Sequence, residues 1–70
     1  MRALFARVGE TLYGPLWQEA IAWDLAVSSR SVRYWLAGRY EIPVGVWGEL
    51  RALALARQED LAHLIAELPP

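Results

Sequence analysis

Residues 28–40 contain three arginines and no acid, in a chain whose formal net charge is −1. These arginines are Arg30, Arg33 and Arg39. A guanidinium group presents its N–H donors as a planar fork, which fits the paired acceptors of a phosphate or of a guanine edge. Residues 58–70, by contrast, hold three acids and no lysine or arginine. The middle of the chain can therefore face a polyanion, and the tail is expected to face something else.

The spacing predicts that two of these arginines share one side of a helix over residues 29–37. Ser28 is suited to its N-cap, because its hydroxyl can accept a hydrogen bond from an unpaired amide of the first turn. At about 100° per residue, one side of the helix is apolar; it carries Val32, Trp35 and Leu36. The opposite side carries Ser29, Arg30, Arg33, Tyr34 and Ala37. We expect this second side to be free, and its donors suit the major groove of a DNA duplex.

Two earlier helices are expected to support that segment. The first is predicted over residues 2–13, and Gly14 interrupts it. The second should begin at Pro15 and end near Ala26, where related turns often use glycine. Ala22 is small enough to stand where the second and third helices cross. The predicted apolar face of the second helix consists of Leu16, Trp17, Ala20, Ile21 and Leu25.

A C-terminal helix completes the predicted architecture. Gly38 is placed for a left-handed cap after the third helix, and Pro43 can open the next one. The apolar stripe over about 44–67 predicts either one long helix or two helices broken near Gln58. The sequence thus predicts a single all-α domain over 1–70, with four or five helices and its two-helix motif at about 16–37.

Composition narrows the functional classes. The chain has 70 residues, 56% of them hydrophobic, and no cysteine. This length allows one domain, and the lack of cysteine excludes disulfides and thiolate metal sites. The first residues break their apolar character at Arg7 and Glu10, so neither a signal peptide nor a membrane span is expected. We therefore expect a cytoplasmic protein without a membrane partner, cofactor or small-molecule ligand.

One pattern at fixed spacing extends from Leu12 to about Leu53. It comprises Gly14, Trp17, the run LAVSSRSVRYWL at 25–36, Gly38, Ile42, Pro43, Val46 and Trp47. This pattern resembles the Cro and lambda-repressor-like (Xre-type) helix-turn-helix domains of phages and bacteria. The resemblance implies a sequence-specific DNA-binding transcriptional regulator, expected to repress its own gene.

The resemblance also assigns roles to individual residues. It implies that the groove readers, which contact bases, are Ser29, Arg30, Arg33 and Tyr34. Contacts to the DNA backbone are implied for Gln18, Ser28 and Arg39. Two positions depart from the family pattern: Tyr34 replaces a common arginine, and Trp23 replaces a usual polar residue. The first departure leaves the base preference open, and the second suggests an added contact surface.

A second apolar feature concerns assembly. A stripe near the C-terminus consists of Leu61, Leu64, Ile65 and Leu68. It can cap the chain's own core or form a homodimer interface, to which Trp23 is a further candidate contributor. Dimerisation is the favoured interpretation, because so short a domain has little internal surface for that much apolar helix. Two recognition helices about 34 Å apart would read the two half-sites of a palindromic operator.

Other interpretations stay open at this point. The third helix can be an ordinary surface helix with solvated arginines, or the scaffold can serve a protein-binding adaptor such as an antitoxin or phage inhibitor. A metal-dependent hydrolase on His63, flanked by Glu59, Asp60 and Glu67, is the weakest interpretation. Ser28, Ser29 and Ser31 have no histidine or lysine base at motif spacing, so we do not expect an enzyme.

Overall fold

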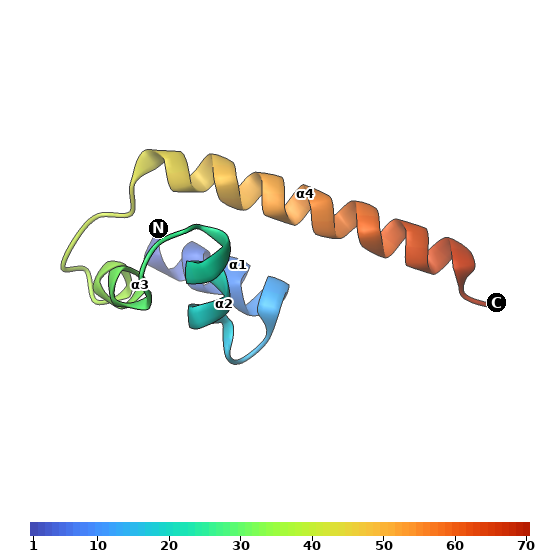
Figure 1. Cartoon of the computed structure of the whole chain (residues 1–70), viewed down its shortest axis with the longest axis horizontal. Helices are drawn as coiled ribbons and strands as arrows, with labels where there is room; N and C mark the ends of the chain where they lie inside the picture. Colours follow the sequence, from blue (N-terminus) through green and yellow to red (C-terminus); the bar gives the residue numbers. More distant parts are fainter.

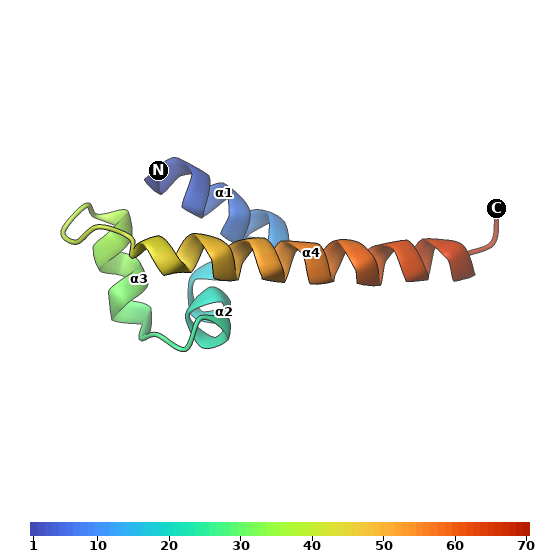
Figure 2. The same cartoon turned by 90° about the horizontal axis from the view of Figure 1, so that it is seen from above.

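The computed structural model describes residues 1–70 as four helices and no strand (Figure 1). The helices are α1 (Arg2–Tyr13), α2 (Trp17–Asp24), α3 (Ser29–Leu36) and α4 (Val44–Glu67). The first three gather at one end, and α4 lies along them and projects beyond them (Figures 1 and 2). The molecule therefore measures 48 × 23 × 20 Å. The expected all-α class is confirmed.

An aromatic cluster forms the centre of the core. Phe5 of α1 is fully buried, and three tryptophan rings meet it edge-on. The distances between ring centroids are 5.7 Å to Trp17, 5.7 Å to Trp35 and 6.4 Å to Trp47. Each tryptophan comes from a different helix, so one side chain of α1 joins all four helices. The apolar, core-facing positions predicted for Trp17 and Trp35 are confirmed, and Trp47 packs against them partly buried.

The connection between α1 and α2 differs from the prediction. Gly14 has φ 82°, which reverses the chain without steric cost only for glycine. Leu16 then takes non-helical dihedrals (φ −99°, ψ 43°) and is 88% exposed. The predictions that Pro15 opens the second helix and that Leu16 belongs to its buried face were therefore wrong. Pro15 and Leu16 instead belong to the turn, and the helix starts at Trp17.

The close approach of α1 and α2 depends on Gly9. This residue is buried, and a Cβ at its position would overlap the Trp17 ring. A second link joins the ends of these two helices, where the Tyr13 hydroxyl donates a hydrogen bond to Asp24 Oδ2. Burial and the hydrogen bond to Asp24 raise the pKa of Tyr13 to about 12. The contact between Gly9 and Trp17 and the hydrogen bond between Tyr13 and Asp24 thus hold α1 and α2 together.

The turn between α2 and α3 ends the second helix at Asp24 rather than near Ala26. Ala26 has φ 56°, which breaks the helical path. The amides of Ala26 and Val27 bond back to the carbonyls of Trp23 (3.1 Å) and Ala22 (3.0 Å), as in a Schellman cap. Ala22 is buried, as expected for the small residue at the crossing.

The fourth helix is continuous, so no break occurs near Gln58. Its first half covers the core through Val46 and Leu50. Arg57 Nη1 then donates to the Leu12 carbonyl at the end of α1 (2.6 Å). Every residue from 54 onward is exposed. The C-terminal stripe therefore does not cover the chain's own core. None of the four helices is long and apolar enough to cross a membrane.

Candidate nucleic-acid interface

Both ends of α3 are fixed by hydrogen bonds. Ser28 is the N-cap, as predicted, and its Oγ accepts from the Ser31 amide at 3.1 Å. At the other end α3 stops at Leu36, one residue before the predicted end. Gly38 has φ 74°, and its amide bonds to the Trp35 carbonyl (3.1 Å), which confirms the predicted left-handed cap. Hydrogen bonds at both ends thus hold α3 in place.

The two sides of α3 differ as the sequence predicts. Val32 and Trp35 are 0% and 6% exposed, whereas Arg30 and Arg33 are open to solvent. Arg33 Nη1 donates to Ser29 Oγ at 3.4 Å, so this guanidinium lies along the first turn of the helix. Three expected groove readers, Ser29, Arg30 and Arg33, therefore come from one accessible side of a short helix.

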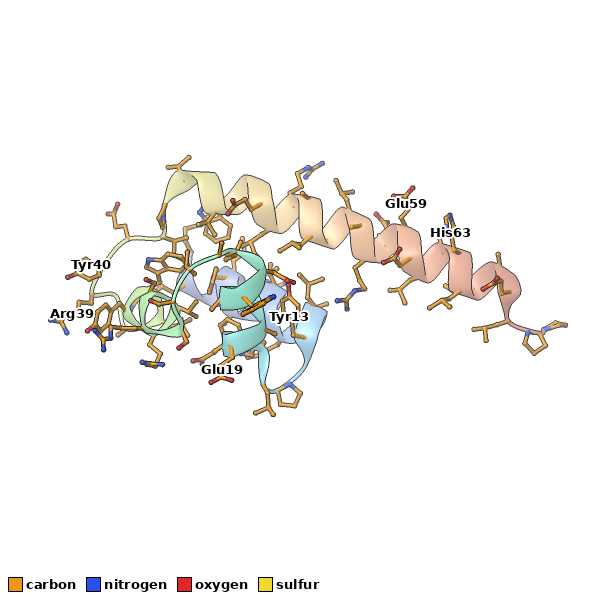
Figure 3. All side chains as sticks on the ribbon, in the orientation of Figure 1. Tyr13, Glu19, Arg39, Tyr40, Glu59 and His63 are labelled. Atoms are coloured by element: carbon orange, nitrogen blue, oxygen red, sulfur yellow. The ribbon has the colours of Figure 1, made fainter.

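The fourth expected reader, Tyr34, belongs to an aromatic and cationic cluster at the far end of α3. The Arg39 guanidinium carbon lies 4.7 Å from the centre of the Tyr34 ring. The Tyr40 ring meets the same ring edge-on, with centroids 5.6 Å apart. The Arg39 amide also bonds to the Tyr34 carbonyl (2.9 Å). Arg39 and Tyr40 project together from the loop after α3 (Figure 3).

Tyr40 is a site residue that the helical spacing missed, because it lies in a loop outside any periodic pattern. The available signal was an aromatic residue within the acid-free segment 28–40. It is 59% exposed and holds Tyr34 from the side. Its contact and that of Arg39 restrict the motion of the Tyr34 ring. Tyr34 is therefore better suited to act as a fixed aromatic surface than as a mobile side chain that reaches a base.

Arg2 is a second residue that the sequence analysis missed. Its Nη1 donates to the Leu36 carbonyl at the end of α3 (3.4 Å) and lies against Gly38. A cation at a helix C-terminus interacts favourably with the helix dipole. Arg2 therefore anchors α1 to α3 and adds positive charge at the C-terminal end of α3. No local spacing could have revealed this contact, because 34 positions separate the two partners.

The α2 end of the expected interface is less favourable to an anion. Gln18 is partly buried in the first turn of α2, and no side chain caps this helix end. Glu19 follows it in the same turn and is exposed. It projects on the side of α2 away from α4 (Figure 3). A carboxylate here opposes the approach of a phosphate, so the expected contact of Gln18 is weakened by its neighbour.

His63 and the serines of the α3 cap are the other residues that the sequence offered for chemistry. His63 and Glu59 project from the same side of α4, far from α1–α3 (Figure 3). No group of three histidine, cysteine or acidic side chains is placed to hold a metal ion. The Ser28 and Ser31 hydroxyls lie 3.1 Å from each other and are engaged in the helix cap.

Comparisons with known proteins found no relative of this chain. No protein-family model matches the chain, and no curated protein or solved structure is detectably similar to it. The functional argument therefore depends on the geometry and charge of this chain alone.

Proposed function

We propose that the protein is a sequence-specific DNA-binding regulator of transcription with a lambda-repressor-like helix-turn-helix, α2–turn–α3. In this proposal α3 enters the major groove and Arg30 and Arg33 read base edges, with Ser29 beside them. Arg39 and Ser28 contact the DNA backbone at the two ends of α3. The observation that carries the proposal is the exposed pair of guanidinium groups on a helix whose other side is buried.

The geometry supports groove reading over a merely solvated surface. Side chains discriminate bases well only when their backbone is held in place, and α3 is held by caps at both ends and by Val32 and Trp35 in the core. An arginine can donate two hydrogen bonds to O6 and N7 of guanine, which favours a guanine-containing operator. The acid-free segment 28–40 around these arginines also favours a polyanionic partner.

The low overall charge has a consequence for the mode of binding. With a net charge of −1, the protein has little general attraction to DNA. Binding must then depend on a local cluster of arginines and on more than one contact region. A homodimer that places two α3 helices on two half-sites supplies this, and the proposed regulator acts as such a dimer, repressing its own gene.

The test is a DNA-binding measurement on the full chain. Selection from a random duplex library, together with DNA from upstream of the protein's own gene, should yield a recurrent palindromic sequence. Binding to that sequence should weaken steeply as salt increases. Arg30→Ala and Arg33→Ala should each lose about 1–3 kcal/mol of specific binding, roughly 5- to 150-fold in affinity, and relax the sequence preference.

A matched control separates local readout from general charge. Ala66→Glu changes the net charge by the same one unit, but it lies on the exposed C-terminal half of α4, away from α3. This variant should bind the selected DNA nearly as the wild type does. If the double variant Arg30→Ala/Arg33→Ala is folded and keeps wild-type affinity, these residues are not the readers and the proposal fails.

A second candidate function is supported by one observation on α2. Trp23 is 85% exposed and Leu16 is 88% exposed, and large exposed apolar groups are common at protein contacts. The same scaffold would then serve as an adaptor that binds another protein. Absence of sequence-selective DNA binding, together with a partner lost on Trp23→Ala, would favour this function over the regulator.

A further inference from the structure

We propose that two copies of this chain dimerise through α4, with the helices antiparallel and the C-terminal half of each lying in a groove of the other. We call residues 58–68, the C-terminal end of α4 with its cap residue, the overhang. The groove lies between α1 and α4 of each chain. This inference specifies the dimer that the proposed function needs, and the surface involved is separate from α3.

The overhang continues the same apolar stripe that covers the core in the first half of α4. At about 100° per residue, Leu61, Leu64, Ile65 and Leu68 fall on the same side as Val46 and Leu50. The first two positions of the stripe are 6% and 3% exposed, whereas the last four are 49–67% exposed. The overhang projects beyond α1, α2 and α3 (Figures 1 and 2). An apolar stripe without a covering surface favours a partner helix.

The total surface indicates how much area is left uncovered. The chain exposes 5424 Å². A compact monomer of 7.9 kDa would expose about 4,400 Å², so the excess is about 1,000 Å². A stable interface between two proteins buries about 800 Å² on each partner. The excess surface of one chain is therefore enough for a dimer interface.

The groove supplies both shape and charge for this partner. Two adjoining hollows share Thr11, Leu12 and Ala54 and form a continuous groove between α1 and α4. The charged residues that line it are all basic: Arg7, Arg51 and Arg57. The larger hollow, of about 870 Å³, is lined mainly by apolar residues and extends from α1 along the overhang of the same chain, where Leu61 and Ile65 line it.

The overhang has the opposite charge. It carries Asp60 and Glu67 at the flank of the apolar stripe, Glu59 on the opposite side of the helix, and no lysine or arginine. Arg51 and Arg57 precede Asp60 and Glu67 along α4, so these acids of one copy come near those arginines of the other only when the two α4 helices run in opposite directions. This complementarity identifies a second copy, in antiparallel orientation, as the occupant. Trp23 lies on α2, outside the groove, and is not part of this interface.

The first experiment measures the mass of the full chain in solution without DNA, by light scattering coupled to gel filtration. We expect twice 7.9 kDa for the wild type. Leu61→Glu/Ile65→Glu should give a monomer with an unchanged near-ultraviolet tryptophan spectrum, because the overhang does not touch the aromatic core. The control Ala52→Glu/Ala66→Glu adds the same charge on the opposite side of α4 and should remain dimeric. A monomeric wild type, or a dimeric Leu61→Glu/Ile65→Glu, overturns the proposal.

The second experiment tests the antiparallel charge pairing. One variant, Arg7→Glu/Arg51→Glu, has an acidic groove and an acidic overhang. The other, Asp60→Arg/Glu67→Arg, has a basic groove and a basic overhang. Each should be monomeric alone, and an equimolar mixture should form a heterodimer in which both contacts join opposite charges. A mixture that stays monomeric, or single variants that dimerise like the wild type, overturns this arrangement.

These outcomes are distinguishable from failure of the DNA-binding proposal. Mass is measured without DNA, and none of the substituted residues lies on α3. A dimer without sequence-selective DNA binding would support the interface and reject the regulator. A monomer that binds selected DNA through Arg30 and Arg33 would do the reverse.

Discussion

Replacing Phe5 with leucine tests whether the aromatic cluster is the main source of stability. Leucine keeps the site apolar but removes three edge-to-face contacts with tryptophan rings. Each such contact is worth about 0.5–1.5 kcal/mol beyond the buried area, so Phe5→Leu should lower the free energy of unfolding by about 2–4 kcal/mol. A chain of 70 residues has roughly 3.5–10 kcal/mol in total. The loss is therefore a large part of the whole.

The assay is thermal unfolding at fixed protein concentration, followed by circular dichroism and tryptophan fluorescence. At about 4–8 °C per kcal/mol for a domain of this size, Tm should fall by roughly 10–25 °C. Leu16→Ala is the matched control, because Leu16 is 88% exposed and its truncation should change the stability by no more than about 0.5 kcal/mol. If Phe5→Leu melts with the wild type, the rings do not pack around Phe5 and the reasoning is refuted.

Three further substitutions have expected effects on stability. Gly9→Ala forces a Cβ into the Trp17 ring and should cost about 1–3 kcal/mol in urea unfolding; an unchanged midpoint would contradict the close packing. Ala26→Gly relieves the positive φ of 56° and should stabilise by about 0.5–1 kcal/mol after the added chain entropy, whereas a loss would contradict that dihedral. Tyr13 has its pKa raised from 10.0 to about 12, so the folded state holds the phenol proton more tightly. The contribution of this proton to the free energy of unfolding is complete below pH 10 and is lost between pH 10 and 12. In urea unfolding of the wild type, the free energy should therefore decline over this pH range, and Tyr13→Phe should remove that part of the decline.

The sequence predicted the structure correctly where a local signal determines the backbone conformation. Ser28 and Gly38 lie at opposite ends of α3, and each has a conformational preference that fixes a helix end without help from distant residues. The alternation of buried and exposed residues along α3 follows from its period alone. The free face that carries Arg30 and Arg33 was therefore predictable.

Prediction failed where a distant contact or a single dihedral decided the outcome. Leu16 has the spacing of a buried residue, but its non-helical dihedrals remove it from the helix and expose it. Tyr40 and Arg2 join the candidate interface through contacts to Tyr34 and Leu36 that do not follow the helical period. Periodicity describes one element at a time, so it contains no information on such contacts.

The overhang is a further case in which the helical period alone does not reveal whether a residue is buried. The apolar stripe of α4 looks uniform in the sequence, because Val46, Leu50, Leu61 and Leu68 all obey one helical period. Only the fold reveals that α1 ends beneath Arg57, which caps the Leu12 carbonyl there. Every position of the stripe beyond that point is exposed, and acids replace arginines beside it. One helix thus completes the core that holds α3 in place and also leaves an apolar surface exposed, which the proposed antiparallel dimer would cover.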